Sequence, residues 1–361
     1  MILFRKIASA TIVVRHKLLA AIMLAAVSTS ASGQDIHFSQ FFNCPYNLNP
    51  GLTGQFNGAY RFVGNQRTQW RSVTVPYSTF GLGADAGKLE LPDGILNKKD
   101  GIENATDLNI GISFFHDKTG DSQLTSNQIN LLIGKDIPVG NDNHSVVSGA
   151  LAIGYTGMNI DYNALQYDNQ WNGFVYDPGI SSDEIFARDS RGYMNLNAGL
   201  IYRKSKSREE EFIGGIAVYN INQPRQSFFN DGYVKLDTRL NLHGSYRFEV
   251  NRDWLVEPML MASFQGTYNA LNFGGLAYYI TDKRSYAWKA IYAGVLGRAS
   301  DAGYVVAGMH YNEWNVGLSY DINTSNLKPA SNGRGGFEIA VIYIIPPAPK
   351  PRKIKVCPDF M

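Results

Sequence analysis

Residues 315–323 read Asn-Val-Gly-Leu-Ser-Tyr-Asp-Ile-Asn, and their strict alternation constrains the fold more than any other stretch of the chain. Successive side chains of a β-strand point to opposite faces, so one face here is entirely apolar and the other entirely small or polar. A soluble sandwich would bury the apolar face. An outer-membrane barrel turns that face toward lipid and lines its lumen with the polar one.

Strand-like segments continue along most of the chain, and clusters of Gly, Asn and Asp separate many of them. Many are about ten to fifteen residues long, whereas strands of soluble sheets have about five or six. A membrane strand needs roughly nine to eleven tilted residues. We therefore predict an all-β fold, a transmembrane outer-membrane β-barrel of about 14 antiparallel strands. The predicted strands are 58–66, 77–88, 107–116, 123–135, 145–158, 191–204, 211–221, 233–248, 253–266, 269–281, 287–299, 302–311, 313–323 and 336–346.

The composition agrees with a barrel. The chain has 36 Gly and 21 Tyr, which suit tight turns and the aromatic girdles of membrane barrels. Its net charge of +2 indicates no strong field, so no nucleic acid is expected as a partner. Five tryptophans lie mostly near predicted strand ends, where they would anchor the barrel in outer-membrane lipid. They are Trp70, Trp171, Trp254, Trp288 and Trp314.

Residues 1–33 have the pattern of a secretory signal peptide. A positively charged stretch precedes the apolar residues 18–27, and small residues follow up to Gly33. The apolar core is too short for a membrane helix, which needs about 20 residues. We predict cleavage near Gln34 and export of the mature protein.

Two segments flank the predicted barrel at 58–346. Residues 34–57 contain prolines and scattered aromatics without a sustained period, which indicates an N-terminal periplasmic or plug segment. Residues 347–361 form a basic, proline-rich tail that cannot continue a sheet ladder. An even number of strands predicts both termini on the periplasmic side, with long connections outside and short ones inside. The connection from Leu89 to Thr106 is long on the predicted inner side. Either it is a periplasmic excursion or the strand count slips by one before it.

Both ends of the mature chain carry recognisable motifs. One end reads His37-Phe-Ser-Gln-Phe-Phe, followed by Asn47-Leu-Asn-Pro-Gly-Leu-Thr-Gly, and the other reads Cys357-Pro-Asp-Phe. These motifs resemble the PorP/SprF family, outer-membrane proteins of the type IX secretion and gliding motility systems of Bacteroidetes. The last motif departs at Asp359, where the family usually has a basic residue.

The resemblance implies a function and partners. It implies a non-enzymatic barrel that contacts periplasmic type IX secretion components. It also implies that the barrel helps to export a large secreted adhesin-like protein, or to attach it at the surface, through the C-terminal sorting domain of that protein. A general porin or small-molecule outer-membrane channel shares the bulk features of the sequence and is the alternative.

Aromatic residues in 34–57 lie outside any predicted strand and have to be buried somewhere. They either fill the lumen or contact a partner, and we favour partial filling of the lumen. The candidate motif, partner or plug residues are His37, Phe38, Ser39, Gln40, Phe41, Phe42, Asn49 and Pro50.

The tail and the two cysteines provide further candidates. The basic residues of the tail would bind an acidic periplasmic partner or lipid headgroups, although charge runs are as often simply solvated. They are Lys350, Arg352, Lys353 and Lys355. Export permits a disulfide. A closed barrel brings its ends together, so Cys44 and Cys357 are candidates for one, and two unrelated thiols are the alternative.

The sequence contains no motif of a familiar catalytic or metal site. It has no Gly-x-Ser-x-Gly, His-Glu-x-x-His or Cys-x-x-Cys. His116 beside Asp117 resembles part of a catalytic dyad, but no nucleophile can be assigned to it, and turn or rim residues explain the pair better. We expect no enzyme activity and no cofactor.

Overall fold

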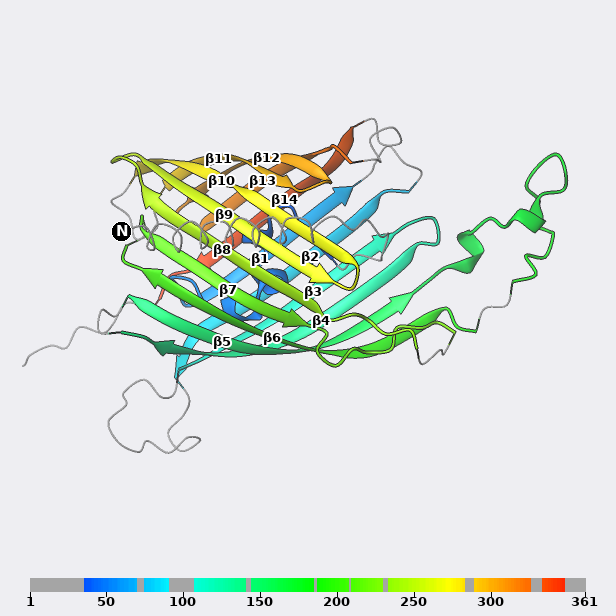
Figure 1. Ribbon diagram of the computed structural model, residues 1–361, viewed down its shortest axis with the longest axis horizontal. Helices are drawn as coiled ribbons and strands as arrows, with labels where there is room; N and C mark the ends of the chain where they lie inside the picture. The colour runs from blue at the N-terminus through cyan, green and yellow to red at the C-terminus, as the bar shows by residue number, and fades with distance from the viewer. Residues whose placement is uncertain are drawn as a thin grey trace, which may run out of the picture.

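The computed structural model describes residues 36–69, 75–90, 107–140, 144–184, 187–207, 209–229, 233–282, 289–325 and 333–347. Within these ranges, fourteen antiparallel strands close into a barrel in which each strand pairs with its neighbours in sequence and β1 pairs with β14 (Figure 1). The strands are β1 (Tyr60–Gln69), β2 (Tyr77–Glu90), β3 (Asp107–Thr119), β4 (Leu124–Pro138), β5 (Ser145–Asn159), β6 (Ser190–Ser205), β7 (Glu211–Tyr219), β8 (Arg239–Glu249), β9 (Trp254–Gln265), β10 (Tyr268–Asp282), β11 (Lys289–Arg298), β12 (Ala302–Tyr311), β13 (Trp314–Asn323) and β14 (Arg334–Ile345).

The predicted fold and strand number are confirmed. The largest difference in bounds is at β8, which begins at Arg239 instead of residue 233. Arg225 and Lys235 pair with each other in a bridge within the connection from β7 to β8, and so do not join the barrel. The strand count does not slip at the connection after β2, because Glu90 pairs directly with Asp107 of β3. The residues between those two lie outside the described ranges.

The alternation of β13 has the orientation of a membrane barrel. Leu318 and Ile322 are 44% and 49% exposed on the outer wall, whereas Ser319 and Asp321 are each 3% exposed and face the lumen. The outer wall is therefore apolar and the lumen face polar on this strand. Within the described residues, no helix is long and apolar enough to cross a membrane.

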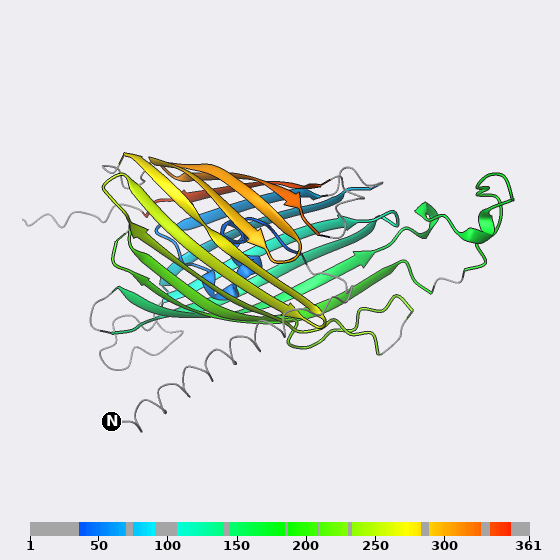
Figure 2. The same cartoon turned by 45° about the horizontal axis from the view of Figure 1, so that its top comes forward.

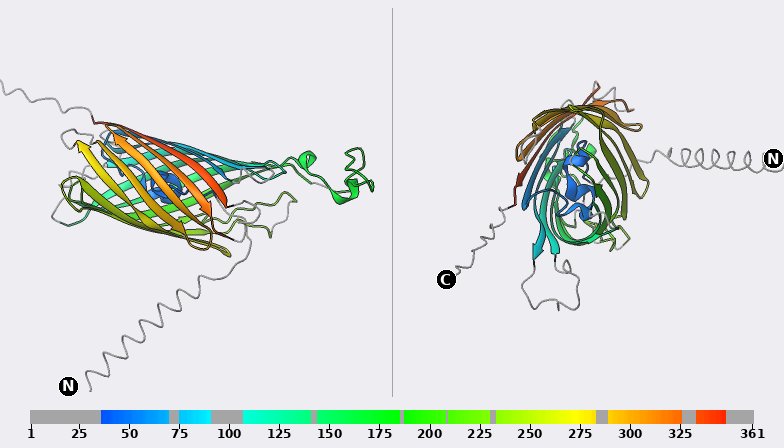
Figure 3. Two further views of the ribbon diagram at one scale, coloured as in Figure 1. Left: turned by 90° about the horizontal axis from the view of Figure 1, so that it is seen from above. Right: turned by 90° about the vertical axis from the view of Figure 1, so that its left-hand side faces the viewer.

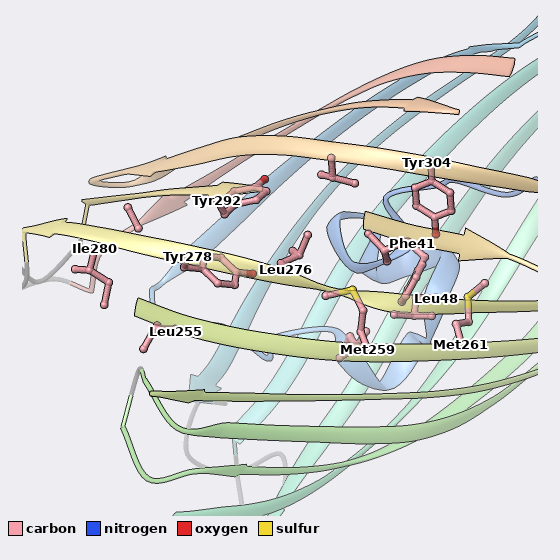
Figure 4. Packing of buried hydrophobic residues seen from close by; sticks show 14 of the residues in the cluster. Phe41, Leu48, Leu255, Met259, Met261, Leu276, Tyr278, Ile280, Tyr292 and Tyr304 are labelled. Atoms are coloured by element: carbon pink, nitrogen blue, oxygen red, sulfur yellow. The ribbon is translucent and has the colours of Figure 1, made fainter. Parts of the chain in front are cut away.

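Strands β9 to β12 depart from this alternation. Many of their lumen-facing side chains are apolar and fully buried, and they pack together as one cluster (Figure 4). Their outer faces are apolar as well, with Leu260 and Val295 exposed on the outer wall. Both faces of these strands are therefore largely apolar. The cluster includes Leu255, Met259, Met261, Leu276, Tyr278, Ile280, Ala290, Tyr292, Leu296, Tyr304 and Val306.

The two ends of the barrel differ in their connections. The connections 160–189, from β5 to β6, and 220–238, from β7 to β8, leave from the same end, which we call the loop end (Figure 1, right). The other end, which we call the base end, holds the start of β1, the end of β14 and the short connections 206–210 and 250–253. It also holds the connection from Glu90 to Asp107, which is shorter than either of the two connections at the loop end. This distribution provides a direction along the barrel axis.

Candidate functional site

The described residues before β1 lie inside the barrel. Residues 36–58, which we call the plug segment, run through the lumen with strands around them (Figures 2 and 3). The carbonyl of Ile36 accepts a hydrogen bond from Arg239, the first residue of β8 at the loop end. At its other end, the plug segment joins β1 at the base end. It therefore runs lengthwise through the lumen.

The plug segment folds as three single turns. They are η1 (Phe41–Asn43), α2 (Pro45–Leu48) and η2 (Pro50–Leu52). Pro45 and Pro50 each stand at the start of a turn, where the missing N–H costs no hydrogen bond. Between α2 and η2, Asn49 is extended, and its side chain accepts from the backbone N–H of Gly51 at 2.8 Å. Prolines five residues apart thus favour short turns over one long helix.

Glu338 on β14 holds the plug segment near the loop end. Its carboxylate accepts hydrogen bonds from the backbone N–H groups of Ser39 at 2.7 Å and Gln40 at 3.0 Å. The Gln40 side chain donates to the backbone carbonyl of Glu338 at 3.2 Å and to that of Gly317 on β13 at 3.4 Å. The two residues are thereby tied to two adjacent strands, and both are fully buried.

A cluster of buried charges surrounds the Ser39 hydroxyl. This hydroxyl donates to Asp321 at 2.7 Å and accepts from Arg67 at 2.9 Å and Arg298 at 3.1 Å. Arg67 also pairs with Asp321 at 2.9 Å. Arg298 pairs with Asp301 at 2.6 Å. Buried charges are tolerated when they are paired and hydrogen-bonded, and here the plug segment supplies one of the bonding groups.

Asp85 on β2 holds the plug segment near the base end. Its carboxylate accepts from the Tyr46 hydroxyl at 2.8 Å and from the backbone N–H of Gly54 at 2.7 Å. The guanidinium of Arg61 on β1 donates to the same carboxylate at 2.9 and 2.7 Å, and also to the carbonyl of Leu52 at 2.9 Å. The side chain of Asp85 is fully buried. The carboxylate of Asp85 thus binds two residues of the plug segment, and the guanidinium paired with it binds a third.

Asn49 contacts the wall between these two anchors. Its amide nitrogen lies 3.2 Å from the carbonyl oxygens of Leu200 on β6 and Ile216 on β7, and 3.0 Å from Nε2 of His243 on β8. This approach requires glycine at position 199, because a Cβ there would overlap the Asn49 amide. The wall is therefore shaped to admit the plug segment.

One face of the plug segment is apolar. Phe41 and Leu48 are buried in the cluster formed mainly by β9 to β12 and lie beside Met259 and Met261 in Figure 4. Leu52 belongs to the same cluster, but its turn, η2, packs against β5 and β6. Burying a side chain of this size contributes about 1.5–3 kcal/mol. The plug segment therefore contacts β9 to β12 mainly through apolar side chains. The part of the wall that makes the polar contacts also holds a smaller apolar cluster, in which Phe38 and Tyr46 pack with Phe115.

The structure brings all eight candidate residues of the N-terminal motif into the lumen. Ser39, Gln40 and Asn49 make the wall contacts described above, and Pro50 is buried beside Asn49. The carbonyl of His37 accepts from Arg67 at 3.3 Å. Of the aromatic members, Phe38 and Phe41 are buried and Phe42 is half-buried against the apolar cluster.

The other candidates have different outcomes. Cys44 is buried in the plug segment, and burial raises the pKa of its thiol well above the ordinary value. Cys357 and the basic tail residues Lys350, Arg352, Lys353 and Lys355 lie outside the described residues. His116 lies 2.8 Å from Asn127 on β4, and Asp117 accepts from Thr79 on β2, so each side chain has a partner on an adjacent strand. Across the described ranges, no group of three His, Cys, Asp or Glu side chains could hold a metal ion.

Sequence reasoning did not single out the wall residues that contact the plug segment. Each anchoring residue is ionisable and stands within a strand, on the face that alternation assigns to the lumen, as Glu338 does between Phe337 and Ile339. A charge in that position needs a partner inside the barrel. That signal could have identified Arg61, Arg67, Asp85, Arg298, Asp321 and Glu338.

These features define a class of protein, a closed β-barrel of the outer-membrane type whose own N-terminal segment lies inside its lumen. A family model described as "Type IX secretion system membrane protein PorP/SprF" matches residues 30–343. The chain belongs to this PorP/SprF family, and the family and the barrel together support a location in the outer membrane. A search of curated protein sequences finds no match to the chain.

Similar solved structures are also barrels. The toluene transporter TbuX of Ralstonia pickettii is 9% identical with a TM-score of 0.45, and the match covers 89% of this chain and 97% of TbuX. The monoaromatic hydrocarbon channel CymD is 10% identical with a TM-score of 0.44, covering 88% of this chain and 95% of CymD. Omp33 of Acinetobacter baumannii is 7% identical with a TM-score of 0.39, covering 80% and 99%.

Proposed function

We propose that this protein is a non-enzymatic, plugged barrel of the type IX secretion system. It helps to export a large secreted adhesin-like protein, or to hold it at the surface, through the C-terminal sorting domain of that protein. The observation that carries the proposal is the plug segment, which is anchored to the wall through Glu338, Asp85 and Asn49. General porins keep a water-filled lumen. A lumen occupied by the barrel's own chain suits a role in binding proteins at its two ends.

The orientation is part of the proposal. Outer-membrane barrels have long extracellular loops and short periplasmic turns. The loop end, with the connections 160–189 and 220–238, would then face outward, and the base end would face the periplasm. The tail that follows β14 leaves at the base end, where its basic residues would contact periplasmic secretion components or lipid headgroups.

The N-terminus has a different place in this orientation. Signal peptide cleavage near Gln34 would leave two residues before Ile36, which lies near the loop end of the lumen. We therefore propose that the plug segment, from Ile36 onward, begins in the lumen toward the outer side. This proposal differs from the expectation of a periplasmic N-terminus. A disulfide between Cys44 and Cys357 would require the tail to reach into the lumen, and it stays a prediction.

Affinity purification from the native outer membrane tests the proposal. An affinity tag is inserted into the exposed turn at residues 120–123, which lies outside the strands and away from the plug segment. We expect periplasmic secretion subunits and one large secreted protein with a C-terminal sorting domain to be enriched, relative to an untagged strain. A barrel that purifies alone and conducts ions in a planar bilayer would contradict the proposal and indicate a channel.

A further inference from the structure

The connection 160–189, which we call the long loop, extends away from the barrel at the loop end (Figures 1 and 3). Polar contacts fix its shape. The buried side chain of Gln170 donates to the carbonyl of Ile180 at 3.0 Å, and the backbone carbonyl of Gln170 accepts from Asp177 at 2.9 Å. An isolated bridge pairs Trp171 with Tyr176. The part of the long loop from residue 170 to residue 180 therefore has a defined form that does not depend on an apolar core.

The turn closed by that bridge presents apolar side chains to the surroundings. Trp171 is 58% exposed, Phe174 is 87% exposed and Val175 is 59% exposed. The side-chain oxygen of Asn172 accepts from the backbone N–H groups of Phe174 and Val175 at 3.0 Å each, which fixes the turn. Ordered aromatic side chains grouped at a surface are typical of protein interaction sites.

The surrounding membrane does not explain this exposure. The long loop projects along the barrel's long direction, beyond the ends of the strands whose outer wall faces lipid (Figure 1). Its tip is therefore remote from the hydrocarbon layer that covers the outer wall. A partner beyond the membrane surface is needed to bury Trp171 and Phe174.

The charge of the long loop indicates the chemistry of that partner. Residues 160–189 contain six acidic residues and one basic residue, which gives a net charge of −5. Complementary charges steer two proteins together and fix their register. A matching surface has an apolar pocket with a basic rim. The acidic residues are Asp161, Asp168, Asp177, Asp183, Glu184 and Asp189, and the basic one is Arg188.

We propose that the long loop is the docking element for a secreted protein partner, whose surface carries an apolar pocket with a basic rim. Trp171 and Phe174 enter the pocket, and the acidic residues face the rim. This inference rests on the proposed function, because it locates on the outward-facing end the contact that the secretion role requires. It assigns that contact to the turn 171–176.

A double substitution tests the aromatic contact. Trp171→Ser with Phe174→Ser removes the apolar side chains without altering the polar contacts of Gln170 and Asn172. The probe is the purified C-terminal domain of the secreted protein that co-purifies with the wild-type barrel. We expect its affinity for the double variant to fall by about 10-fold or more, because two central aromatic anchors are lost. Val250→Ser, an exposed apolar position at the base end, is the matched control and leaves the affinity unchanged.

Charge is tested separately with Asp168→Asn and Asp183→Asn. Asp183 has a φ of 53°, a conformation that asparagine also adopts, so the backbone is preserved. We expect weaker binding at low salt and a smaller difference at high salt, since salt screens the attraction.

The outcomes separate this inference from the function on which it rests. If the wild-type barrel binds the domain and the Trp171→Ser, Phe174→Ser variant binds it equally well, the docking assignment is wrong and the secretion role stands. If the wild-type barrel captures no secreted protein, both fail. If the purified wild-type barrel dimerises and the double variant does not, the turn contacts a second copy of the chain, which also overturns the assignment.

Discussion

Two parts of the lumen wall hold the same plug segment by different physical means. Strands β1 to β8, with β13 and β14, contact it through hydrogen bonds and buried charges, such as those of Asp85 and Glu338, and also through a smaller apolar cluster that includes Phe38 and Phe115. Strands β9 to β12 contact it mainly through apolar side chains, such as Met259 and Met261. We call these parts the polar wall and the apolar wall.

The two walls contribute differently to the position of the plug segment. A hydrogen bond to a fixed carboxylate has a direction and a length, so the polar wall sets which residue lies where. Burial of apolar surface has no direction and depends mainly on area. The apolar wall therefore adds stability but does little to fix which plug residue lies against which wall residue. Position is thus set on one side of the lumen, and both sides contribute to stability.

Asp85→Ala on the polar wall has the largest expected effect. It removes the acceptor for Tyr46 and Gly54 and leaves the buried guanidinium of Arg61 without its carboxylate. Breaking a buried ion pair in this way costs roughly 3–5 kcal/mol. Urea-induced unfolding in detergent micelles measures the loss. Leu82→Ala on the lipid-facing side of the same strand is the control and should lose much less. Equal losses would show that Asp85 has no special role.

Leu276→Ala on the apolar wall should come next. Leu276 is 1% exposed and lies in the cluster that receives Phe41 and Leu48. Removing a buried leucine side chain costs roughly 2–5 kcal/mol, depending on how far the cavity collapses. The control is Leu271→Ala, which lies on the outer wall of the same strand, where detergent replaces the lost contacts. If Leu276→Ala lost less stability than the control, the conclusion that the apolar wall is a packed core would be wrong.

Gly199→Ala should have a smaller effect, confined to the plug segment. The added methyl group overlaps the Asn49 amide, and overpacking of this kind costs roughly 1–3 kcal/mol. Gly149→Ala is the control, because its Cβ would meet Leu200 on the lipid side at an ordinary 3.7 Å. Unfolding in urea gives the stability of both variants. Limited proteolysis shows whether residues 36–58 have become accessible in the first variant alone.

The smallest effect concerns the chemistry of Cys44 and leaves stability unchanged. In a Cys357→Ser background, Cys44 is the remaining thiol. Because burial raises its pKa, it stays a neutral thiol near pH 8, and we expect alkylation on the order of 100-fold slower in the folded protein than in urea. In the unfolded protein the thiol has a pKa near 8.5, so raising the pH from about 7 to about 9 should accelerate its alkylation. Alkylation of Cys44 in the folded protein should stay slow over the same pH range. Fast alkylation of the folded protein would place Cys44 outside the lumen.

The sequence predicted the barrel well, because a lipid-facing surface imposes a period of two on every strand that alternates cleanly. The stretch 315–323 has this period without exception, and β13 covers residues 314–323. Prediction was poorest at the start of β8. Val234 and Leu236 continue the alternation of the strand, but their backbone hydrogen bonds are to residues of the same connection and not to the barrel. Local pattern cannot distinguish a short pairing within a loop from the ladder of a barrel.

The sequence predicted the plug-segment residues of the candidate site, but not the wall residues that anchor them. The motif from His37 to Pro50 marked the plug segment, because its aromatics lie outside any strand and have to be buried. The anchors on the wall could not be matched to it, since Ser39 and Glu338 are 299 positions apart and alternation assigns a face without naming a partner. The apolar lumen face of β9 to β12 also departs from the rule that barrel interiors are polar. It is explained by the apolar face of the plug segment, which only the structure reveals.

The decisive measurement is the ion conductance of the purified wild-type barrel in a planar bilayer. Because residues 36–58 are anchored to both walls, we expect no steady conductance, while a general porin reconstituted in parallel conducts. A steady ohmic current through the wild-type barrel, at a level close to that of the porin, would show that the plug segment does not close the lumen. That result would contradict the proposed function.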